Sequence, residues 1–309
     1  MAKESFFSKY RFTILLLIFI INNAIWVLYT GQQPVQESPQ LNSLMVFILA
    51  VVGFAAGVLG GWIGTGGCSV MLPVLHFWLG FPAPVAVGTT LFAVIFTAIS
   101  GGYGHFRQRN LDRRATIRLG GVGIFGVILG SWLFTFFSGH SALLGLVIGT
   151  VFLWPAIRMT YEGMRGFNPK KGEEKPSDFA HEHIKGNSAN LSIFGMIVGT
   201  LTGLVGLGGG YALVPGLIYL FGAPVYITMG TSLAVMVPMA IVGGSIKLAQ
   251  GFVYLGAALV LASGTIVGAQ IGAATIKKFK PHTLKLIFGL YFLYVAAKFI
   301  TNYFGIHIW

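Results

Sequence analysis

Residues 203–210 read GLVGLGGG, and residues 61–68 read GWIGTGGC. Both stretches lie inside long apolar runs, where the residue pattern otherwise favours a helix. Glycine in a helix interior costs about 1 kcal/mol relative to alanine, so a cluster of glycines predicts that the helix ends there. The same break therefore occurs twice in one chain, and the reason for it decides the fold.

The composition indicates an integral membrane protein. Of the 309 residues, 55% are hydrophobic and only 9% are charged, and the mean hydropathy is +0.80. Soluble domains carry about 25% charged residues. In hydrocarbon, a helix break leaves backbone N–H and C=O groups without water, and it is tolerated only where protein or a polar cavity covers them. We therefore expect both breaks to be covered inside the protein.

The excess of positive charge follows from membrane topology. The formal net charge is +12, but the basic residues fall mainly in loops between apolar segments. The positive-inside rule produces this distribution, so we expect no nucleic-acid partner. The one cysteine, Cys68, excludes an intramolecular disulfide and a multi-cysteine metal site. The sequence predicts no cofactor and no metal.

The N-terminal region predicts a retained transmembrane helix. Lys3, Lys9 and Arg11 precede an apolar stretch over residues 12–29, which is too long for the apolar region of a typical signal peptide and is followed by no clean cleavage site. We expect the N-terminus in the cytoplasm and residues 31–40 in an external linker.

The glycine breaks belong to an internal duplication. Residues 57–112 align without a gap with residues 199–254, at a constant offset of 142. Identical pairs include Gly64/Gly206, Gly66/Gly208, Gly67/Gly209, Pro73/Pro215, Gly80/Gly222, Pro82/Pro224, Gly88/Gly230, Thr89/Thr231, Leu91/Leu233, Gly101/Gly243, Gly102/Gly244 and Gln108/Gln250.

The loop charges predict that the two copies are inverted. Loop 105–118 is rich in arginine, and loop 162–191 is rich in lysine, so both are expected in the cytoplasm. Segment 247–253, which corresponds to the arginine-rich loop, carries one charge and is expected outside, whereas 277–282 is basic and is expected inside.

The crossing count predicts that each break is the tip of a re-entrant hairpin. Segment 43–79 starts outside and helix 84–104 must end inside, so segment 43–79 must enter and leave on one side. The return arm, residues 69–79, is too short for the roughly 20 residues of a full span. We predict hairpins at 43–79 and 192–221, which enter from opposite faces, with tips at 64–68 and 206–210. The predicted full spans are 12–29, 84–104, 119–137, 141–161, 225–246, 254–276 and 283–305.

The predicted fold class is therefore an all-α polytopic membrane protein. It has two inverted-topology repeats, each with a re-entrant helical hairpin and three spanning helices, preceded by one extra N-terminal transmembrane helix. The predicted parts are 1–42 (N-terminal helix and external linker), 43–161 (repeat 1), 162–191 (cytoplasmic loop) and 192–309 (repeat 2). We expect the plasma (inner) membrane as the location and an external C-terminus.

The tips predict a substrate site. Inverted repeats with broken helices near the midplane are common in secondary transporters, and helix N-termini favour anions. The candidate substrate-binding residues are Gly64, Thr65, Gly66, Gly67 and Cys68 in the first tip, Gly206, Gly208, Gly209, Gly210 and Tyr211 in the second, and Thr89, Thr90, Gln108, Thr231, Ser232, Lys247 and Gln250 in the spans. The alternative is that the glycines serve only close helix packing, and that Cys68 is a small buried residue.

The charged residues favour an anion as cargo. Every acidic residue lies in a terminus, a loop or a helix end, so the predicted membrane core contains none of the carboxylates that mark proton relays and cation sites. Lys247 lies in an apolar segment one turn before Gln250, the repeat partner of Gln108. Snorkelling to the interface is the alternative for the lysine, and helix-end hydration is the alternative for the two glutamines.

The duplicated block resembles the sulfite exporter TauE/SafE family of membrane permeases. The stretches that carry the resemblance are GVLGGWIGTGGCSVMLPVL (57–75) with GFPAPVAVGTTL (80–91), and GTLTGLVGLGGGYALVPGLI (199–218) with GAPVYITMGTSLAV (222–235). The similarity extends from about Ser43 to the C-terminus. The resemblance implies transport of sulfur-containing anions such as sulfite and sulfonates. The tips differ, because Trp62, Thr65 and Cys68 stand where the second copy has Leu204, Leu207 and Gly210.

The predicted function is secondary transport of a small organic or inorganic sulfur-containing anion, by alternating access at a midplane site between the tips. An anion channel and a non-transporting membrane assembly protein are the alternatives. The predicted membrane region contains no nucleophile–base pair, metal-ligand set or paired carboxylate, so we expect no enzyme. The expected partners are the anion and the lipid bilayer.

Overall fold

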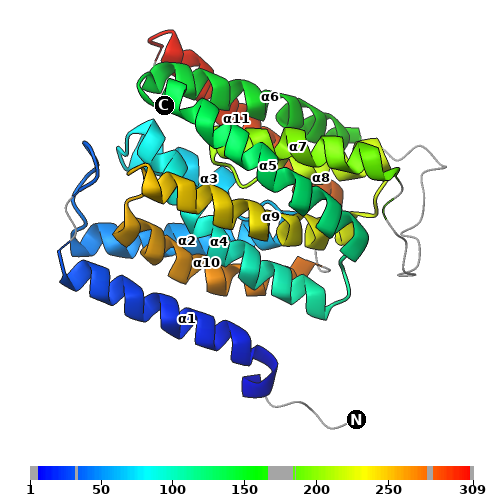
Figure 1. Cartoon of the computed structure of the whole chain (residues 1–309), viewed down its shortest axis with the longest axis horizontal. Helices are drawn as coiled ribbons and strands as arrows, with labels where there is room; N and C mark the ends of the chain where they lie inside the picture. Colours follow the sequence, from blue (N-terminus) through cyan, green and yellow to red (C-terminus); the bar gives the residue numbers. More distant parts are fainter. Residues whose placement is uncertain (1–5, 32–33, 166–183, 185, 277–280, 307–309) are drawn as a thin grey trace.

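The computed structural model describes residues 6–31, 34–165, 184, 186–276 and 281–306, and over these ranges the regular structure is entirely helical. The elements are α1 (Phe6–Tyr29), α2 (Ser43–Ile63), α3 (Cys68–Pro73), the π-helical turn η1 (Val74–Trp78), α4 (Ala83–Arg107), α5 (Arg113–Ser138), α6 (Ser141–Arg165), α7 (Ser188–Val205), α8 (Gly210–Phe221), α9 (Val225–Ala249), α10 (Leu255–Thr275) and α11 (Pro281–Tyr303). Figure 1 shows most of them lying roughly side by side.

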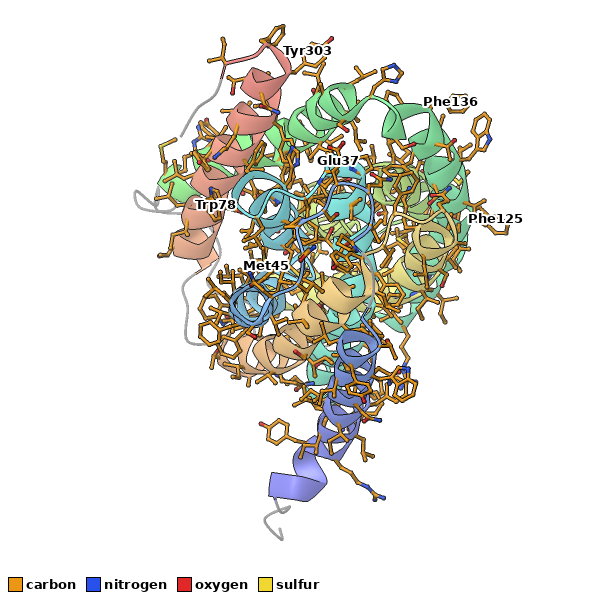
Figure 2. All side chains as sticks on the ribbon, turned by 90° about the vertical axis from the view of Figure 1, so that its left-hand side faces the viewer. Glu37, Met45, Trp78, Phe125, Phe136 and Tyr303 are labelled. Carbon is orange, nitrogen blue, oxygen red and sulfur yellow. The ribbon has the colours of Figure 1, made fainter. Side chains whose placement is uncertain are left out.

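Eight helices within the described residues are long and apolar enough to cross a membrane. They are α1, α2, α4, α5, α6, α7, α9 and α10. Their outer faces are apolar as well: Phe125 and Phe136 of α5 are 66% and 62% exposed, and Figure 2 shows both at the edge of the bundle. The chain is a multi-pass membrane protein, as its composition predicts.

Two of these eight helices differ from the expectation. The predicted spans left out α2 and α7, which were expected as hairpin arms, yet both have span length. At 1.5 Å per residue, the 21 residues of α2 extend about 31 Å. The apolar run of α2 starts at an Asn42 cap, whose side chain accepts from the Met45 N–H at 2.8 Å, and nothing interrupts it before Gly64. Only the return arms, residues 68–78 and α8, are shorter than a span.

The two glycine breaks have the same backbone conformation. Gly64, Gly66 and Gly67 have φ values of 78°, 69° and 75°, and the residues 142 positions later have values of 72°, 67° and 82°. A residue with a Cβ costs roughly 1–2 kcal/mol in this left-handed region, which explains the glycine clusters. Each α2–α3 or α7–α8 connection is therefore a helix break set by three glycines.

Glycines also bring helices into direct backbone contact. The facing positions of α2 and α10 are Gly53 and Leu261, Gly57 and Thr265, Gly61 and Ala269, and those of α7 and α5 are Gly195 and Leu119, Gly199 and Gly123, Gly203 and Val127. In both pairs the numbers rise together, so the helices run parallel. A Cβ on Gly57 would lie 2.6 Å from the Thr265 carbonyl oxygen, and larger residues would separate the helices.

The central helices α4 and α9 run in opposite directions. Gly101 lies against Leu233 and Gly243 against Leu91, so one number rises as the other falls. Gly243 and Leu233 are the repeat equivalents of Gly101 and Leu91, so the offset of 142 residues converts each contact into the other. In Figure 1, α1 lies on one outer side next to α2 and α10, and α6 and α11 lie on the other.

The ends of the helices fall on two sides of the bundle. Figure 1 shows the start of α1, the α4–α5 turn and the start of α7 at one end, and the starts of α2 and α6 and the end of α11 at the other. Parts of two loops predicted to be cytoplasmic, residues 166–183 and 277–280, lie outside the described residues.

Candidate functional site

The two glycine tips meet at the centre of the bundle. The Cys68 thiol, at the start of α3, donates to the carbonyl of Leu207 in the second tip. A Cβ on Gly210 would lie 2.8 Å from the Gly64 carbonyl oxygen, so the start of α8 packs directly on the first tip. Residues of the two repeats, far apart in sequence, are thus brought together in space.

Val94 and Met236 close the space between the tips. They occupy equivalent positions in α4 and α9, and both are fully buried. A Cβ on Gly208 would lie 2.6 Å from the Met236 Cε and 3.0 Å from the Val94 Cγ1, and one on Gly66 would meet the same two side chains. Because methionine is unbranched and flexible, Met236 can vacate this space by rotation.

Three buried hydroxyls at the tips have no hydrogen-bond partner among the described residues. They belong to Thr65, Ser69 and Tyr211, which are only 1–2% exposed. A buried polar group left unsatisfied costs about 1–3 kcal/mol, and such groups in native structures are usually explained by water, an ion or a ligand. The substrate-binding residues predicted from the sequence do not include Ser69, although it is the repeat equivalent of Tyr211.

The hydroxyls of the spans have different tasks. Ser232 donates to the carbonyl of Gly64 at 2.8 Å and so belongs to the first tip. Thr90, its repeat equivalent, donates at 2.7 Å to Ala86 in its own helix.

Thr89 and Thr231 act as acceptors rather than donors in this structure. The Thr89 hydroxyl accepts from the backbone N–H of Tyr254, and the Thr231 hydroxyl accepts from that of Asp112, at 3.0 Å in both cases. Tyr254 and Asp112 precede α10 and α5, so the two threonines join the starts of α4 and α9 to the starts of those helices. The segments GTTL (88–91) and GTSL (230–233) therefore have a structural role in each repeat.

The structure places Gln108 against α10, and Lys247 and Gln250 against α5. The Gln108 amide donates to the Ala273 carbonyl at 2.8 Å, and the Gln250 amide donates to the Ser131 carbonyl at 3.4 Å. These two bonds are equivalent under the repeat. Lys247 is fully buried, with its Nζ 3.1 Å from the centroid of the Phe134 ring.

The described acidic side chains lie away from the tips. Asp112 caps α5, accepting from the N–H groups of Ala115 at 3.1 Å and Ile184 at 2.8 Å. Glu162 pairs with Arg158 at 3.5 Å. Within the described part of the chain, no group of three or more His, Cys, Asp or Glu residues is arranged to hold a metal ion. The tip site thus consists of backbone, hydroxyl, thiol and apolar groups.

A family model described as "Sulfite exporter TauE/SafE" matches residues 49–299. The chain belongs to this family. The match confirms the resemblance carried by the duplicated glycine blocks, and it covers both tips and all of α4–α10.

Curated relatives in the TauE/SafE family agree with this assignment. The chain is 27% identical over 226 residues to the probable membrane transporter protein YdhB of Bacillus subtilis, covering 73% of this chain and 88% of the relative. It is 28% identical over 271 residues to the probable membrane transporter protein YunE of the same species, with 82% and 96% covered. A third relative, the probable membrane transporter protein MJ0441 of Methanocaldococcus jannaschii, is 27% identical over 266 residues, with 79% and 91% covered. No solved structure matches.

TauE/SafE membership and the names of these relatives indicate a membrane transporter and not an enzyme. The geometry is compatible with that role, because the helix breaks and the unpartnered hydroxyls of this family member lie inside the protein rather than against lipid.

Proposed function

We propose that this protein is a secondary transporter of a small sulfur-containing anion, of the sulfite or sulfonate type, with its substrate site between the two tips. The observation that carries the proposal is the meeting of two glycine breaks at three buried hydroxyls without partners: Thr65, Ser69 and Tyr211. The sulfur-containing class comes from the description of the family.

The chemistry of the tips supports an anionic cargo. Hydroxyl groups donate to oxyanions. In the first turn of α8, the N–H groups of Ala212 and Leu213 donate to the Gly209 carbonyl at 3.0 and 2.8 Å, which leaves those of Gly210 and Tyr211 without a partner within the helix. The helix dipole adds partial positive charge at the same place. The described carboxylates lie elsewhere, at the cap of α5, beside Arg158 and, for the exposed Glu37, in the linker before α2, and so would not repel an anion at the tips.

The proposed topology is an inverted repeat with two re-entrant hairpins. Its support is the opposite direction of α4 and α9 together with the matching conformation of the two breaks. The α4–α5 turn, with Arg107, Arg109, Arg113 and Arg114, lies at the same end as the start of α1 (Figure 1). The positive-inside rule supports a cytoplasmic location for that end, and we propose an internal N-terminus and an external C-terminus in the plasma (inner) membrane.

Transport requires the tips to separate. In this structure they are in contact, and Met236 and Val94 occupy the space between them. The close parallel packing suggests which parts move together: α2 and α4 pack on α10, and α7 and α9 pack on α5. Each unit combines helices of both sequence repeats, and the two units meet along α4 and α9. Rocking about that contact would open the tip site alternately to the two sides.

Counterflow in liposomes tests the proposal. Vesicles that contain the purified protein are loaded with unlabelled sulfite, and uptake of labelled sulfite is followed. A secondary transporter gives accelerated uptake when the inside is loaded. Labelled flux without this acceleration would identify the alternative, an anion channel. No flux of sulfite, thiosulfate or sulfoacetate, with no binding of these anions, would favour a non-transporting membrane assembly protein.

A further inference from the structure

A second group of unsatisfied polar atoms lies at the C-terminal end of α9, between this helix and α5. It comprises the Nζ of Lys247, the Oγ of Ser131 and the Oε1 of Gln250, all of them buried and without a hydrogen-bond partner among the described residues. The side chains of Lys247 and Ser131 are completely inaccessible to solvent. None of the three is explained by the packing of the helices.

Aromatic rings and backbone bonds hold this group in place. The Lys247 Nζ lies over the face of Phe134, and the Phe134 ring packs edge-on against Phe252 with centroids 5.2 Å apart. The Phe252 N–H donates to the Lys247 carbonyl at 3.0 Å, which fixes the last turn of α9. The Gln250 amide reaches the backbone of Ser131. The three polar groups therefore lie along the contact between α5 and α9, within one turn of each other on each helix.

The charge of this place is not balanced by the neighbouring protein. A buried ammonium is expensive unless an opposite charge and hydrogen bonds compensate for it, and a ring face compensates only in part. No Asp or Glu occurs in residues 131–138 of α5, in residues 239–249 of α9 or in the turn to residue 254. These segments therefore supply the ammonium with no carboxylate partner.

The corresponding place in the other repeat has a different chemistry. There, His105 takes the position of Lys247, and its Nε2 lies 3.2 Å from the Gly61 carbonyl oxygen. The positions of Ser131 and Phe134 are taken by Ala273 and Ile276. The lysine, hydroxyl and ring therefore occur together at one end of the molecule only, opposite the arginine-rich α4–α5 turn.

We propose that Lys247, Ser131 and Gln250, over the ring of Phe134, form a second anion site, through which the transported oxyanion passes between the tips and the end of α9. This inference rests on the proposed function, because it assigns the same small oxyanion as the ligand. The Lys247 ammonium and the Ser131 hydroxyl donate to the oxygens of the anion, and Gln250 closes the site towards the α9–α10 turn.

Binding measurements with matched lysine variants test this site. Sulfite and thiosulfate are titrated into the whole protein in lipid nanodiscs by calorimetry. Loss of a charge-assisted hydrogen bond predicts that Lys247→Met weakens binding at one of two sites by roughly tenfold or more. The control is Lys298→Met: Lys298 also lies near aromatic rings, 5.1 Å from Phe77 and 5.6 Å from Tyr294, but it is partly exposed and donates to the Tyr294 hydroxyl at 3.2 Å. This variant should bind as the wild type does.

The Ser131→Ala variant tests the same site if the Lys247→Met variant does not fold. It keeps the lysine and removes one donor, so it should weaken the same site several-fold. Unchanged anion binding and uptake in both Lys247→Met and Ser131→Ala would overturn the second site, and the proposed function would stand if a tip variant still abolished uptake. Absence of anion binding by the wild type would overturn both.

Discussion

Replacement of one glycine at the tip by alanine separates a functional tip from a merely structural one. Gly208 has φ +67°, and its side-chain direction leads into the space between the tips. Gly222, after α8, has φ +61°, and a Cβ there has no atom within 4 Å. The two alanine variants therefore share the backbone strain, and only Gly208→Ala places a methyl group in the proposed site.

The structure gives the expected sizes. The left-handed conformation costs an alanine roughly 1–2 kcal/mol, so Gly222→Ala should lower the free energy of unfolding by about that amount. At Gly208, the Cβ would lie 2.6 Å from the Met236 Cε and 3.0 Å from the Val94 Cγ1. Overpacking of this kind adds roughly 1–3 kcal/mol. If this overpacking raises the free energy of the anion-bound state by about 1.4 kcal/mol relative to the free protein, anion affinity and uptake decrease about tenfold.

The assay combines uptake and unfolding. Labelled sulfite uptake into liposomes is divided by the amount of folded protein, and thermal unfolding is measured in nanodiscs. We expect Gly222→Ala to transport like the wild type and Gly208→Ala to transport at least tenfold more slowly. Equal uptake per folded molecule in the two variants would refute the tip site, because the methyl group would then occupy space that the anion never uses.

Other predictions concern topology and packing. In a protein whose only native cysteine is the buried Cys68, a cysteine at exposed position 249 should react with a membrane-impermeant maleimide added outside, and one at exposed position 114 only after the membrane is opened. Thr89→Val removes the acceptor of the Tyr254 N–H and should lower the free energy of unfolding by about 1–3 kcal/mol, measured by denaturation in nanodiscs. Gly126→Val should prevent stable folding, seen as loss of the monodisperse peak in size-exclusion chromatography, because its side chain would collide with the Met196 carbonyl in α7.

Matched controls make these outcomes specific. Gly121→Val, also in α5, should fold, because a Cβ there meets no atom within 4 Å. Thr97→Val should have a small effect, since the Thr97 hydroxyl only donates to Ala93 in its own helix. Maleimide labelling in the reverse order would overturn the orientation. A stable Gly126→Val protein would show that α5 and α7 do not pack as closely as described.

The helical membrane fold is readable from the sequence because its signals are local. A span is a run of apolar residues of fixed length, and hydrocarbon permits few alternatives to a helix. The duplication is equally visible, since Gly64 and Gly206 and their neighbours repeat at one offset. The length of α2 was not anticipated. It depends on where the chain can reverse, and a short return arm does not require a short first arm.

The site was only partly readable, because distance in space is not encoded locally. The sequence predicted the tip glycines and Tyr211 as substrate-binding residues, and it did not include Ser69, whose hydroxyl is buried without a partner at the first tip. Gln108 and Gln250 were grouped with the tips, whereas they bind the backbone of α10 and α5. The sequence correctly showed that the two glutamines are repeat equivalents, because their hydrogen bonds are equivalent in the structure. It did not show where in the fold they lie.

By itself, the sequence determined that this chain is a helical membrane protein, that its core is duplicated, and that two glycine clusters interrupt its helices, because each of these follows from composition or from the pattern of residues along the chain. Tertiary structure alone decided which groups meet: the Cys68 thiol and the Leu207 carbonyl, Met236 between the tips, and Lys247 over Phe134. These contacts join helices far apart in sequence. They depend on the close packing of whole helices at glycines, and the residues next to each group in the chain do not specify that packing.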